Sequence, residues 1–142
     1  MSIHLWNVNG LSSSIHVLET ESTQHDILLL TETWMLPDLQ APDIPDYTCI
    51  SSSRAFMHVR ARRASGGVAC YIKNALANRF ELWRVSLPGS ILWLRSKEKY
   101  LQNEEEHHLF IGLVYIPPKA HLLNVALQIS MLMMSCSKIS QT

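Results

Sequence analysis

Residues 27–30 form an uninterrupted run of large aliphatic side chains, and this run restricts the possible folds more than any other segment. It is bounded by Asp26 and Thr31. A short apolar run between polar residues is typical of a β-strand that is buried on both faces. Such a strand needs one layer of structure on each side. The sequence therefore predicts a layered α/β core.

The residues before this run predict a strand and a helix. Residues 3–7 alternate and are rich in large apolar side chains, and the Asn9-Gly10 pair that follows supplies a turn. The serines at residues 12–14 are suitable N-caps for a helix that ends before His25. Strand, helix and buried strand in succession form a βαβ-like unit, so we expect the two strands to pair in parallel.

The rest of the chain predicts further strands separated by loops. We expect these strands at residues 47–51, 68–72, 80–85, 91–95 and 109–115. Three prolines mark residues 35–46 as a loop, and Pro88-Gly89 marks a turn. Residues 52–65 and 96–108 lack an apolar period, so we expect loops there too. Residues 120–137 carry no charge, but polar residues interrupt them and their apolar residues recur at helical spacing, which predicts an amphipathic helix rather than a membrane span.

Charge is distributed unevenly along a chain that is neutral overall, with 12 basic and 12 acidic residues. Residues 1–53 hold seven acidic residues and no Lys or Arg, whereas residues 54–100 hold ten basic and two acidic residues. An acidic part beside a basic part can gather a metal ion and a phosphate backbone, or the two parts can simply attract each other.

The expected loop at residues 52–65 contains four arginines. They are Arg54, Arg60, Arg62 and Arg63. Such a cluster can contact a nucleic-acid backbone with salt-dependent affinity, or it can be solvated. In either case we expect an exposed, poorly ordered loop, because residues 52–65 have no repeating apolar face.

Cysteine usage and the N-terminal residues favour an intracellular protein. The chain has three cysteines without a CxxC pair, and its seven histidines have no zinc-ligand spacing. The first twenty residues do not combine a basic start with an apolar run, so we expect no signal peptide. We therefore expect a nuclear or cytoplasmic protein that is neither secreted nor bound to a membrane.

Two polar residues, Asn7 and Glu32, stand where predicted strands end. Ligands of open α/β sheets bind beyond the carboxyl ends of the strands, so side chains at these positions converge on one crevice. Mg²⁺ takes oxygen ligands and often only one or two carboxylates. Glu32 is thus a candidate metal ligand, and the alternative is a solvated loop residue.

Four tryptophans could serve as platforms for nucleic-acid bases. They are Trp6, Trp34, Trp83 and Trp93. Aromatic side chains stack on bases in many single-strand binding proteins. All four lie in or beside predicted strands, however, which favours packing in the core.

Four blocks of sequence occur in an order and at a spacing that resemble a known superfamily. The blocks are LWNVNGL at residues 5–11, DILLLTETW at 26–34, GGVACYI at 66–72 and LVYIPP at 113–118. They resemble the endonuclease/exonuclease/phosphatase superfamily, the fold of DNase I and the apurinic repair endonucleases, and are most similar to endonuclease domains of non-LTR (LINE-like) retrotransposons. The resemblance implies the N-terminal half of a DNase I-like two-sheet α/β sandwich, with a mixed sheet and flanking helices.

The resemblance also implies roles for individual residues. Asn7 matches the asparagine that helps to orient metal and phosphate, Glu32 matches the metal-binding glutamate, and Tyr115 matches the tyrosine that contacts the scissile phosphate. Asn9 stands at a near-metal position that is an aspartate in some relatives, so this chain has one fewer charge there. The implied reaction is hydrolysis of a DNA phosphodiester with Mg²⁺ or Mn²⁺ as cofactor.

The sequence departs from the superfamily after Tyr115. The family continues with a Gly-Asp-x-Asn block, an Asp-bearing strand and a terminal Ser-Asp-His block, whereas this chain has no Asp beyond Asp46 and only His121 after Tyr115. A lone histidine on an expected helix is more often a surface or core residue than a catalytic one. We therefore expect a partial domain at residues 3–124 and a divergent, helical tail at residues 125–142.

These observations leave hypotheses of different classes open. One is a truncated metal-dependent endonuclease domain that keeps Asn7, Glu32 and Tyr115 but is inactive alone for lack of a His-Asp pair. Another is a non-catalytic remnant or binding module, and a third is a phosphatase or deadenylase on the same fold. Half a sandwich would also leave an apolar sheet face uncovered, through which the chain could pair with another chain.

Overall fold

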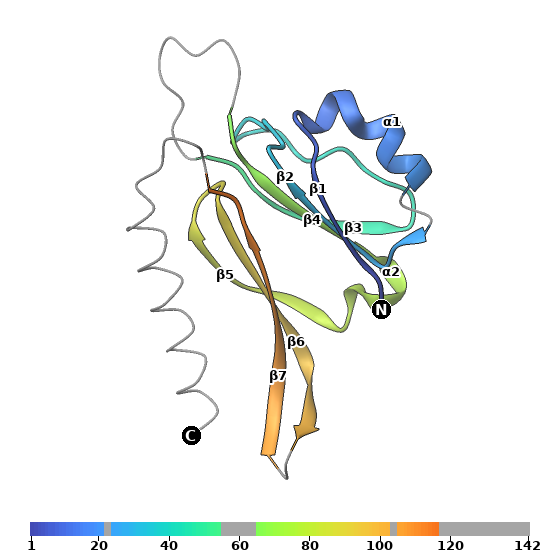
Figure 1. Ribbon diagram of the computed structural model, residues 1–142, viewed down its shortest axis with the longest axis vertical. Helices are drawn as coiled ribbons and strands as arrows, with labels where there is room; N and C mark the ends of the chain where they lie inside the picture. The colour runs from blue at the N-terminus through green and yellow to red at the C-terminus, as the bar shows by residue number, and fades with distance from the viewer. Residues whose placement is uncertain (22–23, 55–64, 103–104, 117–142) are drawn as a thin grey trace.

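The computed structural model describes residues 1–21, 24–54, 65–102 and 105–116 (Figure 1). The arginines at 60, 62 and 63 and the expected helix at 120–137 lie outside these residues. The described part contains two β-sheets that face each other, with one long helix on the outer side of the first sheet. Among its helices, none is long and apolar enough to cross a membrane.

The first sheet is mixed and has the strand order β1-β2-β4-β3. Strands β1 (Ile3–Asn7) and β2 (Ile27–Thr31) pair in parallel and are connected by helix α1 (Leu11–Glu21), which confirms the expected strand-helix-strand unit. Strand β4 (Val68–Lys73) lies antiparallel between β2 and β3 (Tyr47–Ser52).

The second sheet is an antiparallel meander of three strands. The chain reaches it from β4 through the short helix α2 (Asn74–Ala77), which the sequence did not predict. Its strands are β5 (Phe80–Leu87), β6 (Ile91–Gln102) and β7 (Glu105–Val114), in that order. The turn expected at residues 88 and 89 joins β5 to β6.

The expectation of a polar loop at residues 96–108 was wrong. Strands β6 and β7 include residues 96–102 and 105–108 and project beyond the sandwich as a twisted ribbon (Figure 1). Charged side chains pair along the exposed strands: Nζ of Lys99 lies 2.6 Å from Glu106, and Nη2 of Arg79 lies 3.0 Å from Glu98. Most of its described residues are exposed or only half-buried, so no apolar period in the sequence marks it.

The apolar run at residues 27–30 is buried on both faces, as its composition predicts. Leu28 and Leu30 pack toward α1 in one core that includes Leu18. Ile27 and Leu29 face the second sheet, in a separate core with residues of β4, β6 and β7. Strand β2 is therefore the centre of a three-layer arrangement of helix, sheet and sheet.

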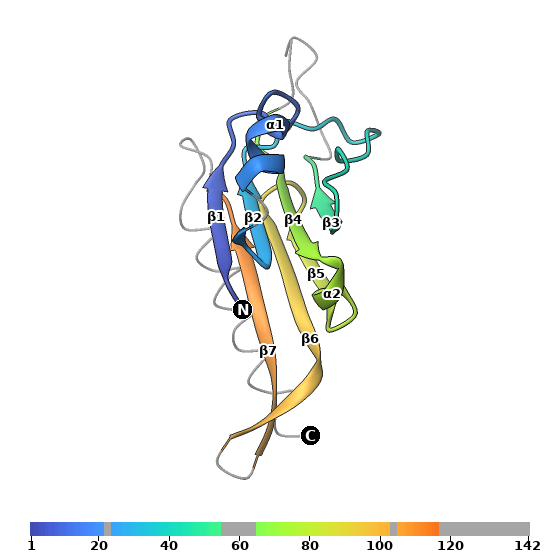
Figure 2. The same ribbon diagram turned by 90° about the vertical axis from the view of Figure 1, so that its right-hand side faces the viewer.

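The inner face of the first sheet is covered by the second sheet except along its edge strand β1. Ile3 and Leu5 pair in register with Ile27 and Leu29 and so share their face, yet they are 44% and 65% exposed. The second sheet has one strand fewer, and its edge strand β7 lies on the same side of the sandwich as β1 (Figure 2). Within the described residues, the uncovered apolar surface on the inner face of the first sheet thus lies along β1.

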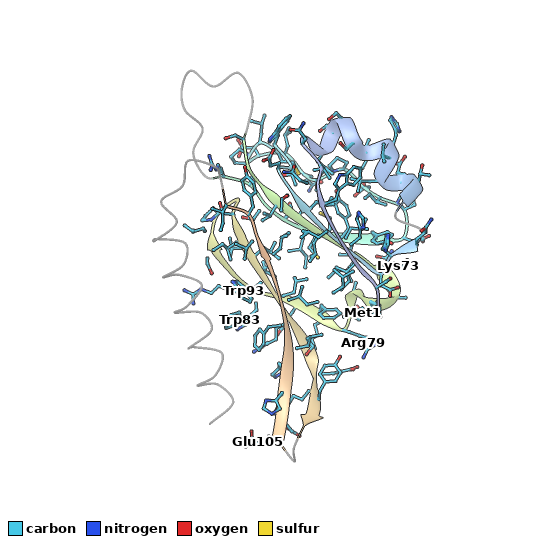
Figure 3. The ribbon with its side chains drawn as sticks, viewed as in Figure 1. Met1, Lys73, Arg79, Trp83, Trp93 and Glu105 are labelled. Carbon is cyan, nitrogen blue, oxygen red and sulfur yellow. The ribbon has the colours of Figure 1, made fainter. Side chains whose placement is uncertain are left out.

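The tryptophans differ in how fully they pack. Trp93 is buried and Trp83 is half-buried, both on the face of the second sheet turned away from the first (Figure 3). The ring of Trp83 packs edge-on against Phe110, with centroids 5.0 Å apart. Trp6 and Trp34 are half-buried, and Trp6 packs against the core beneath α1. Full core packing is therefore confirmed for Trp93 alone.

Candidate active site

Loops from both sheets meet at one end of the sandwich. Strands β1, β2, β3, β5 and β7 end there, and β4 and β6 begin there, as their pairing directions require. This is the end at which Asn7 and Glu32 stand. The positions of these two residues in the sequence predicted that side chains from separate strands would converge here.

Backbone hydrogen bonds fix the loop after β1 to the loop after β2. The N–H groups of Val8, Gly10 and Leu11 donate to the carbonyl oxygens of residues 31, 32 and 33, at 3.0, 2.8 and 2.9 Å. The segment that carries Glu32 therefore continues the strand pairing beyond the last residue of β2. Its position relative to Asn7 is set by the backbone rather than by flexible side chains.

A second series of backbone hydrogen bonds connects Glu32's loop to the second sheet. The N–H of Trp34 donates to Gly66 and the N–H of Gly67 donates to Gly89, each at 2.9 Å. The N–H of Tyr115 donates to Ser90 at 2.8 Å. Five chain segments, far apart in sequence, thus form one continuous platform under the candidate site.

The backbone around Glu32 adopts an uncommon conformation. Glu32 and Trp34 both have φ of 54°, and Asn9 has φ of 48°. Non-glycine residues seldom occupy this left-handed region, and they cluster at functional sites when the surrounding structure enforces it. Between Glu32 and Trp34, the side chain of Thr33 is buried against Gly67, whose φ is 89°.

Tyr115 and Glu32 contact each other directly although 83 residues separate them in sequence. The Tyr115 hydroxyl donates a hydrogen bond of 3.0 Å to Oε1 of Glu32. Partial burial raises the pKa of Tyr115, and the neighbouring Glu32 carboxylate raises it further. The phenol is therefore held in its neutral, hydrogen-donating form beside the carboxylate.

Asn7 and Asn9 stand at the end of β1 and in the loop that follows it. Asn7 is the last residue of β1 and pairs in register with Thr31, the residue before Glu32. Its Oδ1 accepts a hydrogen bond of 3.2 Å from the backbone N–H of Asn9. Asn7 thus stands one strand away from Glu32, with its side chain bonded to its own loop and exposed to solvent.

Arg54 is the one member of the arginine cluster that the structure describes. We expected an exposed side chain, whereas Arg54 is half-buried. Its Nη1 donates a hydrogen bond of 3.3 Å to Oγ of Ser65. A Cβ placed on Gly89 would lie 2.6 Å from the backbone nitrogen of Arg54 and 2.7 Å from its Cγ. The backbone and stem of this arginine therefore pack against a glycine of the platform.

The donors available to a metal at this site are few. Within the described residues, no group of three or more His, Cys, Asp or Glu side chains could hold a metal ion. Glu32 offers one carboxylate, and the amide oxygen of Asn7 lies on the adjacent loop. A set of this size suits a hydrated Mg²⁺ or Mn²⁺ ion that keeps most of its water ligands.

The residues that support the site were not predicted from the sequence. From the sequence, Gly66 and Gly67 were noted only in the block at residues 66–72 that resembles the superfamily, and Gly89 only as part of a turn. Three glycines with φ of 70°, 89° and 73° allow three chain segments to approach more closely than side chains would permit. The paired glycines before an apolar strand were the one available signal.

Solved structures provide the comparison for this arrangement, because no family model and no curated protein matches the chain. The crystal structure of the AP endonuclease from Leishmania major superposes with a TM-score of 0.62 at 16% identity, over 89% of this chain. The fold is DNase I-like. The APE2 catalytic domain of Xenopus laevis superposes with a TM-score of 0.55 at 21% identity, over 84% of this chain. The DNase I-like chain spans only 44% and 46% of these two neighbours.

Proposed function

We propose that this chain is the N-terminal half of a divalent-metal-dependent phosphodiesterase domain that acts on DNA. The observation that carries the proposal is the hydrogen bond between Tyr115 and Glu32 at the strand ends of a DNase I-like fold. The four sequence blocks further favour an origin in the endonuclease domains of LINE-like retrotransposons. A Gly-Asp-x-Asn block and a reverse transcriptase frame in the genomic sequence downstream would test that origin.

Each residue has a defined role in this proposal. The Glu32 carboxylate, with the amide oxygen of Asn7 nearby, holds a hydrated Mg²⁺ or Mn²⁺ ion. When bound, such an ion stabilises negative charge that develops on a phosphate. Tyr115 keeps Glu32 oriented through its hydrogen bond and contacts the scissile phosphate. Asn9 contributes its backbone N–H to the position of Asn7.

The chain by itself is expected to bind DNA without cleaving it. Beyond Tyr115 the sequence contains no Asp, and His121 is the only histidine there. No His-Asp pair can therefore orient or deprotonate the attacking water. General acid-base help of this kind is typically worth about 10²–10⁴-fold in rate, and the weak metal site adds to the deficit.

Metal binding at Glu32 can be tested without activity. Mn²⁺ broadens NMR signals of nearby nuclei, so substoichiometric Mn²⁺ should broaden the ring signals of Tyr115 and the amides of Glu32 and Thr33. Glu32→Gln should abolish this broadening. Glu98→Gln removes a carboxylate from the projecting ribbon and should leave it intact. Broadening of Tyr115 that persists in Glu32→Gln would refute the metal site.

Plasmid nicking tests the second part of the proposal. The purified chain with Mg²⁺ should give no more nicked circles than buffer does. Metal-dependent nicking that disappears in Glu32→Ala would show that the chain is a complete enzyme. Nicking that survives in Glu32→Ala would indicate a contaminating nuclease.

A further inference from the structure

Arg54 has no acidic partner among the residues that the structure describes, in contrast to two other arginines of this part of the chain. Arg79 pairs with Glu98 and Arg95 pairs with Glu81. The only polar contact of the Arg54 guanidinium within the described residues is its bond of 3.3 Å to Ser65. Among the described residues, most donors of this half-buried guanidinium have no partner and are available to a ligand.

The guanidinium of Arg54 lies beside the phenol that contacts Glu32. A Cβ placed on Gly66 would lie 3.1 Å from Nε of Arg54 and 3.4 Å from Cε1 of Tyr115. Arg54 and Tyr115 therefore flank the same glycine. The positive charge of Arg54 also acts on the phenol, because it lowers the pKa of Tyr115 against the opposite effects of burial and Glu32.

The position of Arg54 is fixed more firmly than that of an ordinary surface arginine. Its backbone and Cγ lie against Gly89, whose N–H donates a hydrogen bond of 3.0 Å to Oγ of Ser52. Gly66 has φ of 70°, so a residue with a side chain would be strained there as well as crowded. These two glycines leave room for the arginine stem and direct the guanidinium toward Tyr115.

We propose that Arg54 binds an internal phosphate of a DNA strand beside the Tyr115–Glu32 pair. A guanidinium offers a planar set of donors that matches two phosphate oxygens at once. Its charge offsets the repulsion that the Glu32 carboxylate exerts on an approaching phosphate. This inference rests on the proposed function in its choice of DNA as ligand, and it assigns phosphate binding to one fixed arginine rather than to the whole cluster.

The test measures duplex binding at several salt concentrations. A fluorescein-labelled 16-base-pair duplex without 5′-phosphates is titrated with the chain in EDTA, and anisotropy gives the dissociation constant. Arg54→Gln keeps a side-chain stem over Gly89 and removes the charge, Arg54→Lys restores the charge, and Arg84→Gln is the matched control on an exposed strand position. Urea unfolding of each variant verifies that it folds.

Arg54→Gln should weaken binding about tenfold at low salt and reduce the slope of log K against log [salt] by about 0.9, the value for one phosphate contact on duplex DNA. Arg54→Lys should restore the slope but only part of the affinity. Arg84→Gln should change neither quantity. If Arg54→Gln and Arg84→Gln weaken binding equally, or if the Arg54 dependence appears only with a 5′-phosphorylated duplex, the inference is overturned. The Mn²⁺ experiment is independent of this result, because binding is measured without metal.

Discussion

Gly67 connects three segments of the site platform, and replacing it with alanine should destabilise the protein substantially. Its N–H donates to Gly89, and its carbonyl accepts from Thr33. Two separate costs arise from a methyl group at this position. The residue has φ of 89°, and the new Cβ would lie 2.3 Å from Oγ1 of Thr33.

The two costs can be estimated from general magnitudes. A left-handed backbone costs a non-glycine residue roughly 1–2 kcal/mol. Forcing a carbon into a packed interior costs typically about 1–3 kcal/mol, and Thr33 is only 2% exposed, so its hydroxyl cannot easily move away. Gly67→Ala should therefore lower the free energy of unfolding by about 2–5 kcal/mol, a large part of the roughly 5–15 kcal/mol that holds a typical domain together.

A double-mutant cycle separates the clash from the backbone strain. Thr33→Ala removes Oγ1, and the remaining Cβ of Thr33 lies 3.6 Å from the new methyl, an ordinary contact. By itself Thr33→Ala should cost less than about 1 kcal/mol, because the buried hydroxyl has no hydrogen-bond partner to lose. In the Gly67→Ala protein, adding Thr33→Ala should restore about 1–3 kcal/mol of the free energy of unfolding. The loss that remains is then the cost of the left-handed backbone at residue 67.

Urea unfolding of the four proteins, followed by far-UV circular dichroism, measures these free energies. Equal m-values across the set are the control for an unchanged unfolding transition. A loss below about 0.5 kcal/mol for Gly67→Ala would show that the loop relaxes freely. A loss that Thr33→Ala does not reduce would show that the contact with Oγ1 is not the source of the cost.

Three further predictions concern the core, the open edge and Tyr115. Leu92 lies between the sheets, so Leu92→Ala should lower the free energy of unfolding in urea by about 2–5 kcal/mol. Leu39 is exposed, and Leu39→Ala should change this free energy by no more than about 0.5 kcal/mol. Similar losses for the two variants would contradict the assignment of Leu92 to the core. We propose that the open β1 edge promotes pairing of chains, so Leu5→Lys should raise the monomer fraction in sedimentation velocity and Val17→Lys, on exposed α1 surface, should not. The pKa of Tyr115 is raised above its ordinary value of 10.0, so the neutral phenol should contribute fully to the free energy of unfolding below pH 10. This contribution should be lost as the pH rises through the raised pKa. An equally steep loss of stability in Tyr115→Phe over the same pH range would disprove the prediction.

The sequence predicted the central part of the fold because that part depends on local pattern. Four aliphatic residues in succession, as at 27–30, can be buried on both faces only in the middle of a layered structure. The strand before it and the intervening helix are separated from it by short connections. The prediction that the serines at 12–14 cap this helix was wrong, because α1 begins at Leu11 and the serines lie in its first turn, where the hydroxyls of Ser13 and Ser14 donate to backbone carbonyls. Parallel pairing of β1 with β2 then follows from the handedness and length of such units. The resemblance to DNase I-like proteins agreed with this reasoning and with the observed fold.

Patterns failed where exposed structure is stabilised by pairing across strands. Residues 96–108 are polar and rich in charged residues without an apolar period, so their sequence does not differ from that of a polar loop. What extends β6 and β7 through them is the ladder of hydrogen bonds and pairs such as Lys99 with Glu106, which exist only after the two strands meet. The short helix α2 was missed for a similar reason, since four residues carry no measurable period.

The candidate site also combines residues that local sequence predicted with contacts that only the tertiary structure makes. The sequence by itself placed Asn7 and Glu32 at strand ends, because strand termini are marked by the change from apolar to polar residues. Only the tertiary structure brought Tyr115 to Glu32 across 83 residues, and only it placed Arg54 on Gly89 and beside Tyr115. These contacts depend on how two sheets pack and on the close approach that three left-handed glycines allow. Local propensity extends over a few residues, whereas the distance between two loops is decided by the packing of everything that connects them.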